Sequence, residues 1–227
     1  VLHIGTKKAG STLIQAFLKQ NRKRLPELGW SYPSFTMNRN HAEFALPFEQ
    51  PANDTHHLYK IGTPELAEAK LHELAEALRA QVTPESQWVI SSEYLSTRLR
   101  TDEQVEAAVG FLRQFFDQID VVVVMRRQEV VLPSVFSQYV TDGFISEWSW
   151  EFCERERPII DCELIMRRWG RVVGRESITA IPFIEENKRD PRWLLEQFAA
   201  AAGIPIDSTW RTPSSEHANS SLSAEGI

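Results

Sequence analysis

The stretch VLHIGTKKAGSTLIQAFLKQNRK, residues 1–23, gives the strongest indication of the fold class. Its first four residues, Val1 to Ile4, are mostly apolar and predict a short buried strand. Residues 11–23 carry apolar side chains at the spacing of one helical face, so they predict a helix. A strand, a turn that contains glycine and a helix, in this order, form the start of a βα unit.

Strands and helices continue to alternate after this unit. Extended segments are predicted at 29–33, 88–91, 119–125 and 177–181, and helices at 64–81, 101–116, 128–140, 161–173 and 192–202. The run Val121–Val124 consists of β-branched residues, which is typical of a strand covered on both faces in a parallel sheet. The pattern predicts an α/β fold, a central parallel sheet flanked by helices, in a single domain over 1–227.

Composition and charge argue against several classes of protein. The 227 residues carry a net charge of −6, whereas a nucleic-acid-binding protein usually has a basic face. Cys153 and Cys162 lie outside any CxxC spacing, so we expect no metal site and read both as reduced thiols of a cytoplasmic protein. No apolar run approaches the ~20 residues of a transmembrane helix. Because the chain opens directly on a strand and ends without a helix stop signal, trimmed termini and a removed leader remain open.

The segment after the first strand has the properties of a phosphate cradle. Small residues let backbone N–H groups turn inward around an anion, and the following helix adds the positive end of its dipole. Hydroxyl and lysine side chains supply further donors. The residues of this loop are Gly5, Thr6, Lys7, Lys8, Ala9, Gly10, Ser11 and Thr12. The alternative is a glycine-rich turn that binds no ligand.

This loop is not a Walker A motif, because Ser11 rather than lysine follows Gly10. Lysine ahead of the glycine, as in Lys8-Ala9-Gly10-Ser11-Thr12, instead resembles the 5′-phosphosulfate loop of sulfotransferases that use 3′-phosphoadenosine-5′-phosphosulfate (PAPS). Ala9 departs from the serine or threonine usual there. The resemblance implies one sulfotransferase domain, a P-loop-NTPase-like three-layer sandwich. It also implies that PAPS is the sulfuryl donor, adenosine 3′,5′-bisphosphate the product, and Lys8 a catalytic residue, with no metal required.

A second phosphate site is predicted where the 119–125 strand ends. Arg126 follows that strand and Ser134 lies eight residues further on, about two helical turns into the next segment. An arginine and a serine that converge there suit a phosphate group. The pair resembles the 3′-phosphate site of the same family, and PAPS carries phosphates at both ends of its ribose. A surface arginine at a strand end is the alternative reading.

Two residues are candidates for the general base that sulfuryl transfer requires. Glu93 follows the 88–91 strand, where a carboxylate would lie near the transferred group, although it could instead only pair with Lys8 or Arg126. His41 is the rival base, in the long polar loop 33–60, which we predict to be an acceptor-side lid. Part of the family uses glutamate and part uses histidine. A loop histidine without a catalytic role is the alternative for His41.

Weaker matches extend along the chain. Trp169, Gly174 and the strand 178–182 resemble a late helix-and-strand segment of bacterial sulfotransferases, and 219–223 resembles an Asn-x-Ser-Leu-Ser element near their C-terminal nucleotide loop. The Arg-Lys-Gly-rich loop of the cytosolic animal enzymes is not found in this sequence. The residues that would contact the adenine of PAPS, and part of those that would contact its 3′-phosphate, are therefore not assigned.

The acceptor, a hydroxyl or amine of a small molecule, carbohydrate or lipid, is not readable from the sequence. Trp148 and Trp150 could stack on it, or could be core residues. A P-loop kinase or NTPase and a non-catalytic binding module of the same fold remain the alternative functions.

Overall fold

The computed structural model describes residues 1–34, 40–49, 61–145, 147–184 and 190–213. Its main sheet has four parallel strands in the order β4-β1-β5-β6. These strands are β1 (Leu2–His3), β4 (Ile90–Ser91), β5 (Val121–Arg126) and β6 (Ile178–Phe183). β5 and β6 pair over their full length, from Val121 opposite Ile178 to Arg126 opposite Phe183.

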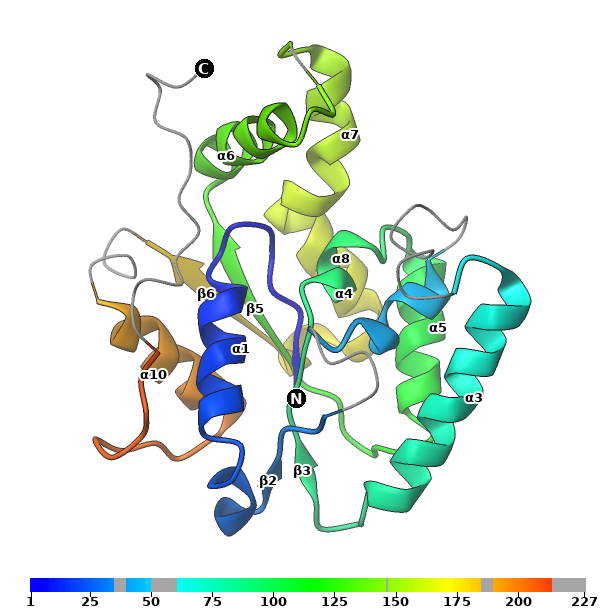
Figure 1. The fold of residues 1–227 in the computed structure, drawn as a ribbon, viewed down its shortest axis with the longest axis vertical. Helices are drawn as coiled ribbons and strands as arrows, with labels where there is room; N and C mark the ends of the chain where they lie inside the picture. The colour runs from blue at the N-terminus through cyan, green and yellow to red at the C-terminus, as the bar shows by residue number, and fades with distance from the viewer. Residues whose placement is uncertain (35–39, 50–60, 146, 185–189, 214–227) are drawn as a thin grey trace.

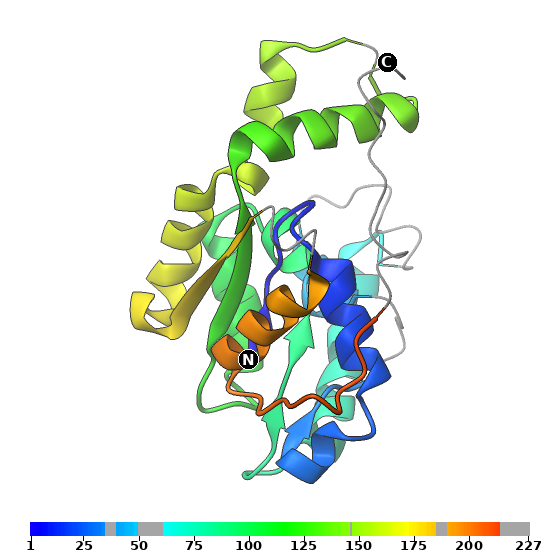
Figure 2. The same cartoon turned by 90° about the vertical axis from the view of Figure 1, so that its left-hand side faces the viewer.

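The helices form one layer on each face of this sheet (Figure 1, Figure 2). α1 (Ser11–Gln20) and α10 (Pro191–Ala202) pack on one face, and α5 (Asp102–Leu112) and α8 (Cys162–Val173) pack together on the other. Alternate valines of β5 divide between the two layers, because Val121 and Val123 join one core cluster and Val122 and Val124 the other. This confirms the predicted α/β sandwich, and it explains the continuous β-branched run: both faces of β5 are buried.

Several predicted elements lie close to their predicted bounds. α3 (Pro64–Gln81) has the bounds that the sequence predicts. Thr101 caps the N-terminus of α5, where its side chain and that of Gln104 form a capping box. Asp161 caps the N-terminus of α8, and Gly174 is the residue after its C-terminus. α6 (Gln128–Thr141) runs through Pro133, whose side chain is exposed.

The segment 88–91, predicted as one strand, is divided between two sheets. β3 (Gln87–Trp88) pairs with β2 (Trp30–Ser31) in a small two-stranded sheet, whereas β4 joins the main sheet beside β1. Val89 lies between them, and its N–H donates to the carbonyl of Ser31 at 2.9 Å. The chain therefore passes from the small sheet to the main sheet within one residue.

Several helical segments have no counterpart in the sequence-based prediction. They are α4 (Tyr94–Thr97), α7 (Trp150–Ile160) and the 3₁₀ turns η1 (Leu25–Leu28), η2 (Ala42–Phe44), η3 (Leu46–Phe48) and η4 (Arg175–Ser177). η2 and η3 make part of the predicted 33–60 loop a folded, buried segment, while 35–39 and 50–60 lie outside the described residues. Within the described part of the chain, no helix is long and apolar enough to cross a membrane.

α6 and α7 pack together at the carboxyl end of the sheet (Figure 1). They have a small core of their own, formed by Val131, Val135, Phe152, Ile159 and Ile160. Figure 2 shows α6 passing above the end of β5, on the side of the sheet to which the loop between β1 and α1 rises. This helix pair therefore faces the candidate site described below.

Candidate functional site

The loop between β1 and α1 has no room for a side chain at its two glycines. A Cβ atom on Gly5 would lie 2.0 Å from Ser11 Oγ. Gly10 adopts a φ of 82°, and a Cβ atom there would lie 2.6 Å from Leu194 Cδ2. Gly5 is required because the loop folds tightly back on Ser11 in the first turn of α1, and Gly10 is required because of its positive φ and the close packing of Leu194 from α10.

Three contacts hold this loop against the carboxyl ends of the neighbouring strands. Ser96 Oγ, in α4, donates to the carbonyl of Gly5 at 2.6 Å. Thr6 Oγ1 donates to the carbonyl of Val124 in β5 at 2.7 Å. Arg126 Nη1 donates to the carbonyl of Lys8 at 3.3 Å. The loop is thus fixed between β4 and β5 before any ligand binds.

The first turn of α1 offers donors for an anion. Gly10, the N-cap, provides no side chain to cap the helix, so the N–H groups of the first turn lack a side-chain acceptor from that residue. Ser11 is buried, and its hydroxyl has no hydrogen-bond partner within the described structure. Thr12 is exposed beside it. A buried hydroxyl without a partner is unfavourable unless a bound group satisfies it, which fits the phosphate cradle predicted here.

The two lysines of the loop have different surroundings. Lys7 Nζ donates to Tyr139 Oη at 3.1 Å and forms an ion pair with Glu156 Oε2 at 3.3 Å, so its ammonium is bound by α6 and α7. Lys8 is half-buried and has a φ of 60°. Burial lowers the pKa of Lys8 from its usual 10.5, while the charge of Glu93 opposes that shift. The side chain of Lys8 is therefore the better placed of the two to interact with a ligand.

Glu93 lies within electrostatic range of this lysine. It directly precedes α4, and it follows β4 after one intervening residue. Burial raises the pKa of the Glu93 carboxyl above its usual 4.5, and the charges of Lys7, Lys8 and Arg98 oppose the rise. Within the described part of the chain, the Glu93 carboxylate makes no ion pair within 4 Å, so no structural ion pair occupies it. A half-buried carboxylate of raised pKa suits a general base.

His41 is buried rather than exposed on a polar lid. Its Nε2 lies 3.0 Å from the carbonyl of Pro33, and the backbone N–H of Ser91 donates to its Nδ1 at 3.0 Å. This pairing requires the neutral tautomer with the proton on Nε2. Burial lowers the pKa of His41 to about 4. Both ring nitrogens thus have structural contacts, which tie the 40–49 segment to β4.

Arg126 and Ser134 occupy the positions expected from the sequence, at the end of β5 and in α6. The Arg126 guanidinium lies over the ring of Phe183, with Cζ 5.5 Å from its centroid. The hydroxyl of Ser134 is buried and has no hydrogen-bond partner within the described structure. A buried, unpartnered hydroxyl on a helix above the strand ends is consistent with a further anion contact.

The structure adds residues to this site that the sequence did not indicate. Ser92, next to Glu93, is buried and its hydroxyl has no partner in the described structure. Asp142, after α6, lies close enough to affect the pKa of Lys8. Tyr139 and Glu156 bind Lys7. Ser92 adjoins Glu93 in the chain, whereas the other three residues belong to no local motif, and α7, which carries Glu156, was not predicted.

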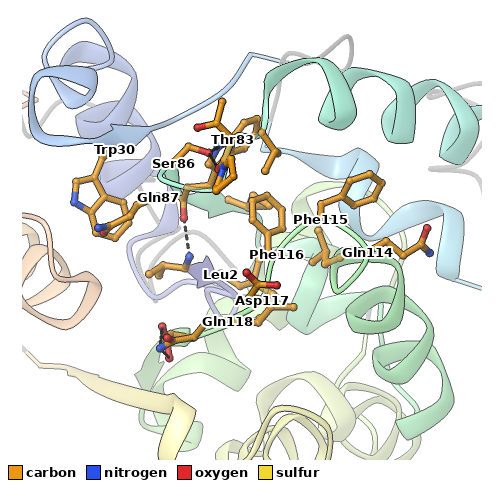
Figure 3. A pocket seen from close by; sticks show the side chains of 18 of the residues that line it. Leu2, Trp30, Thr83, Ser86, Gln87, Gln114, Phe115, Phe116, Asp117 and Gln118 are labelled. Carbon is orange, nitrogen blue, oxygen red and sulfur yellow. Dashed lines mark hydrogen bonds between the residues drawn. The ribbon is translucent and has the colours of Figure 1, made fainter.

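A pocket of about 760 Å³ lies elsewhere, at the amino-terminal ends of the strands (Figure 3). Leu2, Trp30, Phe115 and Phe116 are among the residues that line it. Parallel sheets of this kind bind ligands at the carboxyl ends of their strands, and none of the candidate residues lies on this pocket. We therefore do not include it in the site.

Some expectations concern features with little or no described structure. The element at 219–223 lies outside the described residues. Cys153 and Cys162 are free thiols, and no group of three potential metal ligands occurs among the residues that the structure describes. Trp148 and Trp150 are half exposed or more, and Trp148 packs against Phe136 and Phe152.

The fold has known counterparts among solved structures. A sulfotransferase from Alicyclobacillus acidocaldarius is similar with a TM-score of 0.60 and 16% identity, over 99% of this chain and 86% of that one. The sulfotransferase domain from the curacin biosynthetic pathway is similar with a TM-score of 0.50 and 14% identity, over 92% of this chain and 75% of that one. No family model and no curated protein matches the sequence. These likenesses show that the chain has the sulfotransferase fold.

Proposed function

We propose that this chain, which has the fold of a sulfotransferase, moves a sulfuryl group from PAPS to a hydroxyl or amine of an acceptor. The observation that carries the proposal is the gathering of Lys8, Glu93 and Arg126 where β1, β4 and β5 end. Donors for an anion are present there, and a carboxylate lies within electrostatic range of a lysine. These are the groups that a transfer between two oxygen atoms needs.

The residues present fit a nucleotide with phosphates at both ends of its ribose. The backbone of the 5–10 loop, the N-terminus of α1 and the unpartnered hydroxyl of Ser11 would hold the 5′-phosphosulfate. Arg126 and the unpartnered hydroxyl of Ser134 would hold the 3′-phosphate. PAPS, when bound, supplies the activated sulfuryl group.

The chain's own groups then have separate tasks. Glu93, with its raised pKa, accepts the proton of the acceptor hydroxyl. Lys8 offsets the negative charge that develops on the oxygen of the departing phosphate. The loop, fixed by Ser96 and Arg126, keeps these donors in place beforehand, so little reorganisation is needed during the reaction. The lysine and backbone donors can stabilise this charge without a metal ion.

The acceptor belongs to the proposal only as a class. Three exposed aromatic side chains lie between α6 and α7 or at the first residue of α7, namely Phe144, Trp148 and Trp150. Aromatic side chains of this kind stack on sugar rings or pack against lipids. We propose a small-molecule or glycan acceptor, and no nucleic acid.

Calorimetric titration with adenosine 3′,5′-bisphosphate, beside ATP with Mg²⁺, tests the nucleotide site. We expect metal-independent binding of the bisphosphate, lost in Arg126→Ala. Arg127→Ala is the matched control, because Arg127 is 78% exposed and pairs with Glu129 at the surface. Binding of ATP with Mg²⁺ alone would support a kinase or NTPase. Binding of neither nucleotide would support a non-catalytic module.

A further inference from the structure

Lys7, the first lysine of the loop, is held by side chains of α6 and α7. Its ammonium lies 3.3 Å from Glu156 Oε2, 3.1 Å from Tyr139 Oη and 4.8 Å from the centroid of the Tyr139 ring. The ion pair joins residues 149 positions apart in the chain. The phosphate loop and the α6–α7 helix pair are thereby connected through one side chain.

Glu156 is the centre of this cluster. Its side chain is 1% exposed. Oε2 contacts Lys7 and accepts from Tyr139 Oη at 3.5 Å, while Oε1 accepts from Arg155 Nε at 3.2 Å. Arg155 also lies over the rings of Tyr139 and Phe152. A buried carboxylate is stable only when its charge is compensated, so removal of its charge leaves the ammonium of Lys7 without its partner.

The position of Lys7 matters because the next residue is strained. Lys8 has a φ of 60°, which non-glycine residues adopt only when their surroundings enforce it. The loop is held on one side of this residue by the side chain of Lys7, and at the residue itself by Arg126, which binds the carbonyl of Lys8. The two anchors together fix the peptide units that would face the anion.

We propose that Glu156 is a positioning residue of the donor site, which acts through Lys7 to hold the phosphate loop in its binding conformation. The effect of Glu156 on the affinity for the nucleotide rests on the proposed function. Glu156 binds the ammonium of Lys7, whereas Arg126 binds the carbonyl of Lys8, so the two adjacent lysines are held by different partners. α6, which the same cluster fixes, carries Ser134, so Glu156 supports both halves of the donor site.

Glu156→Gln gives a test in which charge and position predict opposite results. The substitution removes a negative charge near an anion site. The loss of Coulombic repulsion alone therefore predicts tighter binding of adenosine 3′,5′-bisphosphate. Loss of loop positioning predicts weaker binding, by about tenfold or more, since small displacements of binding groups are costly. Glu154→Gln is the matched control, because Glu154 lies on the same helix and its side chain is 46% exposed. We expect the control to bind as the wild type does.

Amide hydrogen exchange of residues 5–11, followed by mass spectrometry, gives a readout that does not depend on the nucleotide. We expect Glu156→Gln to speed exchange in this loop by about fivefold or more, and Glu154→Gln to leave it unchanged. Lys7→Met removes the same ion pair between Lys7 and Glu156 and leaves Glu156 paired with Arg155. This variant replaces Glu156→Gln in the exchange experiment if Glu156→Gln does not fold. We expect the same faster exchange in that variant.

The outcomes separate this inference from the proposed function. If the wild type binds the bisphosphate and Glu156→Gln binds it equally well or more tightly, the positioning role is wrong. If the wild type does not bind it, the proposed function fails, and the exchange of residues 5–11 alone decides the positioning role. Unchanged exchange in both variants overturns it. A lower melting temperature with unchanged affinity and loop exchange would show a purely structural role and would also overturn it.

Discussion

At the scale of single residues, the candidate site depends on a few positions where the local conformation is unfavourable by itself. Lys8 adopts a φ of 60°, at a cost of roughly 1–2 kcal/mol for a non-glycine residue. Gly5 and Gly10 leave no space for a Cβ atom. Ser11 and Ser134 each bury a hydroxyl without a partner in the described structure. Such costs persist where a bound ligand or a functional requirement offsets them.

Lys8→Ala tests the residue assigned to charge stabilisation. We expect turnover to fall by about a hundredfold or more, the scale of a lost transition-state donor. The measurement is release of adenosine 3′,5′-bisphosphate from PAPS in the presence of a panel of phenols and sugars. Lys19→Ala, at the exposed end of α1, is the control and should keep full turnover. Near-normal turnover of Lys8→Ala would exclude the assigned role.

Glu93→Gln tests the general base. A base works in its deprotonated form, so the rate of the wild type should fall as the pH drops through the raised pKa of Glu93. We expect the variant to lose turnover and this acidic limb of the pH–rate profile, while its affinity for the bisphosphate stays near that of the wild type. If His41→Ala shows this behaviour and Glu93→Gln does not, the base is His41.

At the scale of elements, segments that carry no regular pattern are held by buried polar contacts. The turns η2 and η3 are joined to β4 by His41, whose two ring nitrogens contact Pro33 and Ser91. The adjacent Glu43 is buried, and its carboxylate has no hydrogen-bond partner in the described structure. Burial raises the pKa of Glu43 to about 7. Stability of this segment should therefore depend on pH.

The pH dependence that Glu43 contributes has a definite sign. Because the pKa of its carboxyl rises from the usual 4.5 to about 7 in the folded protein, the native state binds the proton more tightly than the unfolded state does. Its contribution to stability is fully present below pH 4.5 and is lost as the pH rises through 7. The loss is on the order of 3 kcal/mol, from about 1.4 kcal/mol for each pKa unit.

Urea denaturation of the wild type and of Glu43→Gln, at about pH 5 and about pH 8 on either side of this transition, measures the effect. We expect the free energy of unfolding of the variant, relative to the wild type, to increase between the two pH values. The difference is needed because burial lowers the pKa of both His3 and His41, which makes their contributions change with pH in the opposite direction. Glu68→Gln, on the exposed face of α3, should show no such change. An equal effect of Glu43→Gln at both pH values would contradict the prediction.

At the scale of the whole molecule, the parallel sheet gathers groups that are distant in sequence at one edge. β1, β4 and β5 end beside one another, so Lys8, Glu93 and Arg126 converge there although more than a hundred residues separate the first from the last. The α6–α7 pair lies above this edge and has its own small core. A ligand bound there would contact both the sheet and this pair, and should stabilise the domain as a unit.

Thermal unfolding with adenosine 3′,5′-bisphosphate tests this coupling. A ligand that binds only the native state at about 100 times its Kd adds about 2.7 kcal/mol to the free energy of unfolding. For a chain of this size we expect a rise in Tm of roughly 5–10 °C, by the usual dependence of Tm on free energy. EDTA should not change the shift, and Arg126→Ala should abolish it. A shift that requires Mg²⁺ would favour the kinase or NTPase alternative.

Features that depend on neighbours in the chain could be predicted from the amino-acid sequence. Local periodicity and turn chemistry predict the strand, glycine-bearing loop and helix of residues 1–20. They also predict the buried run Val121–Val124 and the bounds of α3. The candidate positions of Lys8, Glu93 and Arg126 follow from them, because parallel strands present their carboxyl ends at one edge.

Features that depend on contacts between distant residues became visible in the three-dimensional structure. Trp88 and Ile90 belong to different sheets because β2 pairs with the first part of one extended segment and β1 pairs with its second part. Pro33 and Ser91 bind the ring of His41, and Glu156, 149 residues away from Lys7 in the chain, binds the ammonium of Lys7. No local pattern encodes these pairings, since the free energy that fixes them is gained only when the chain has brought both partners out of water together.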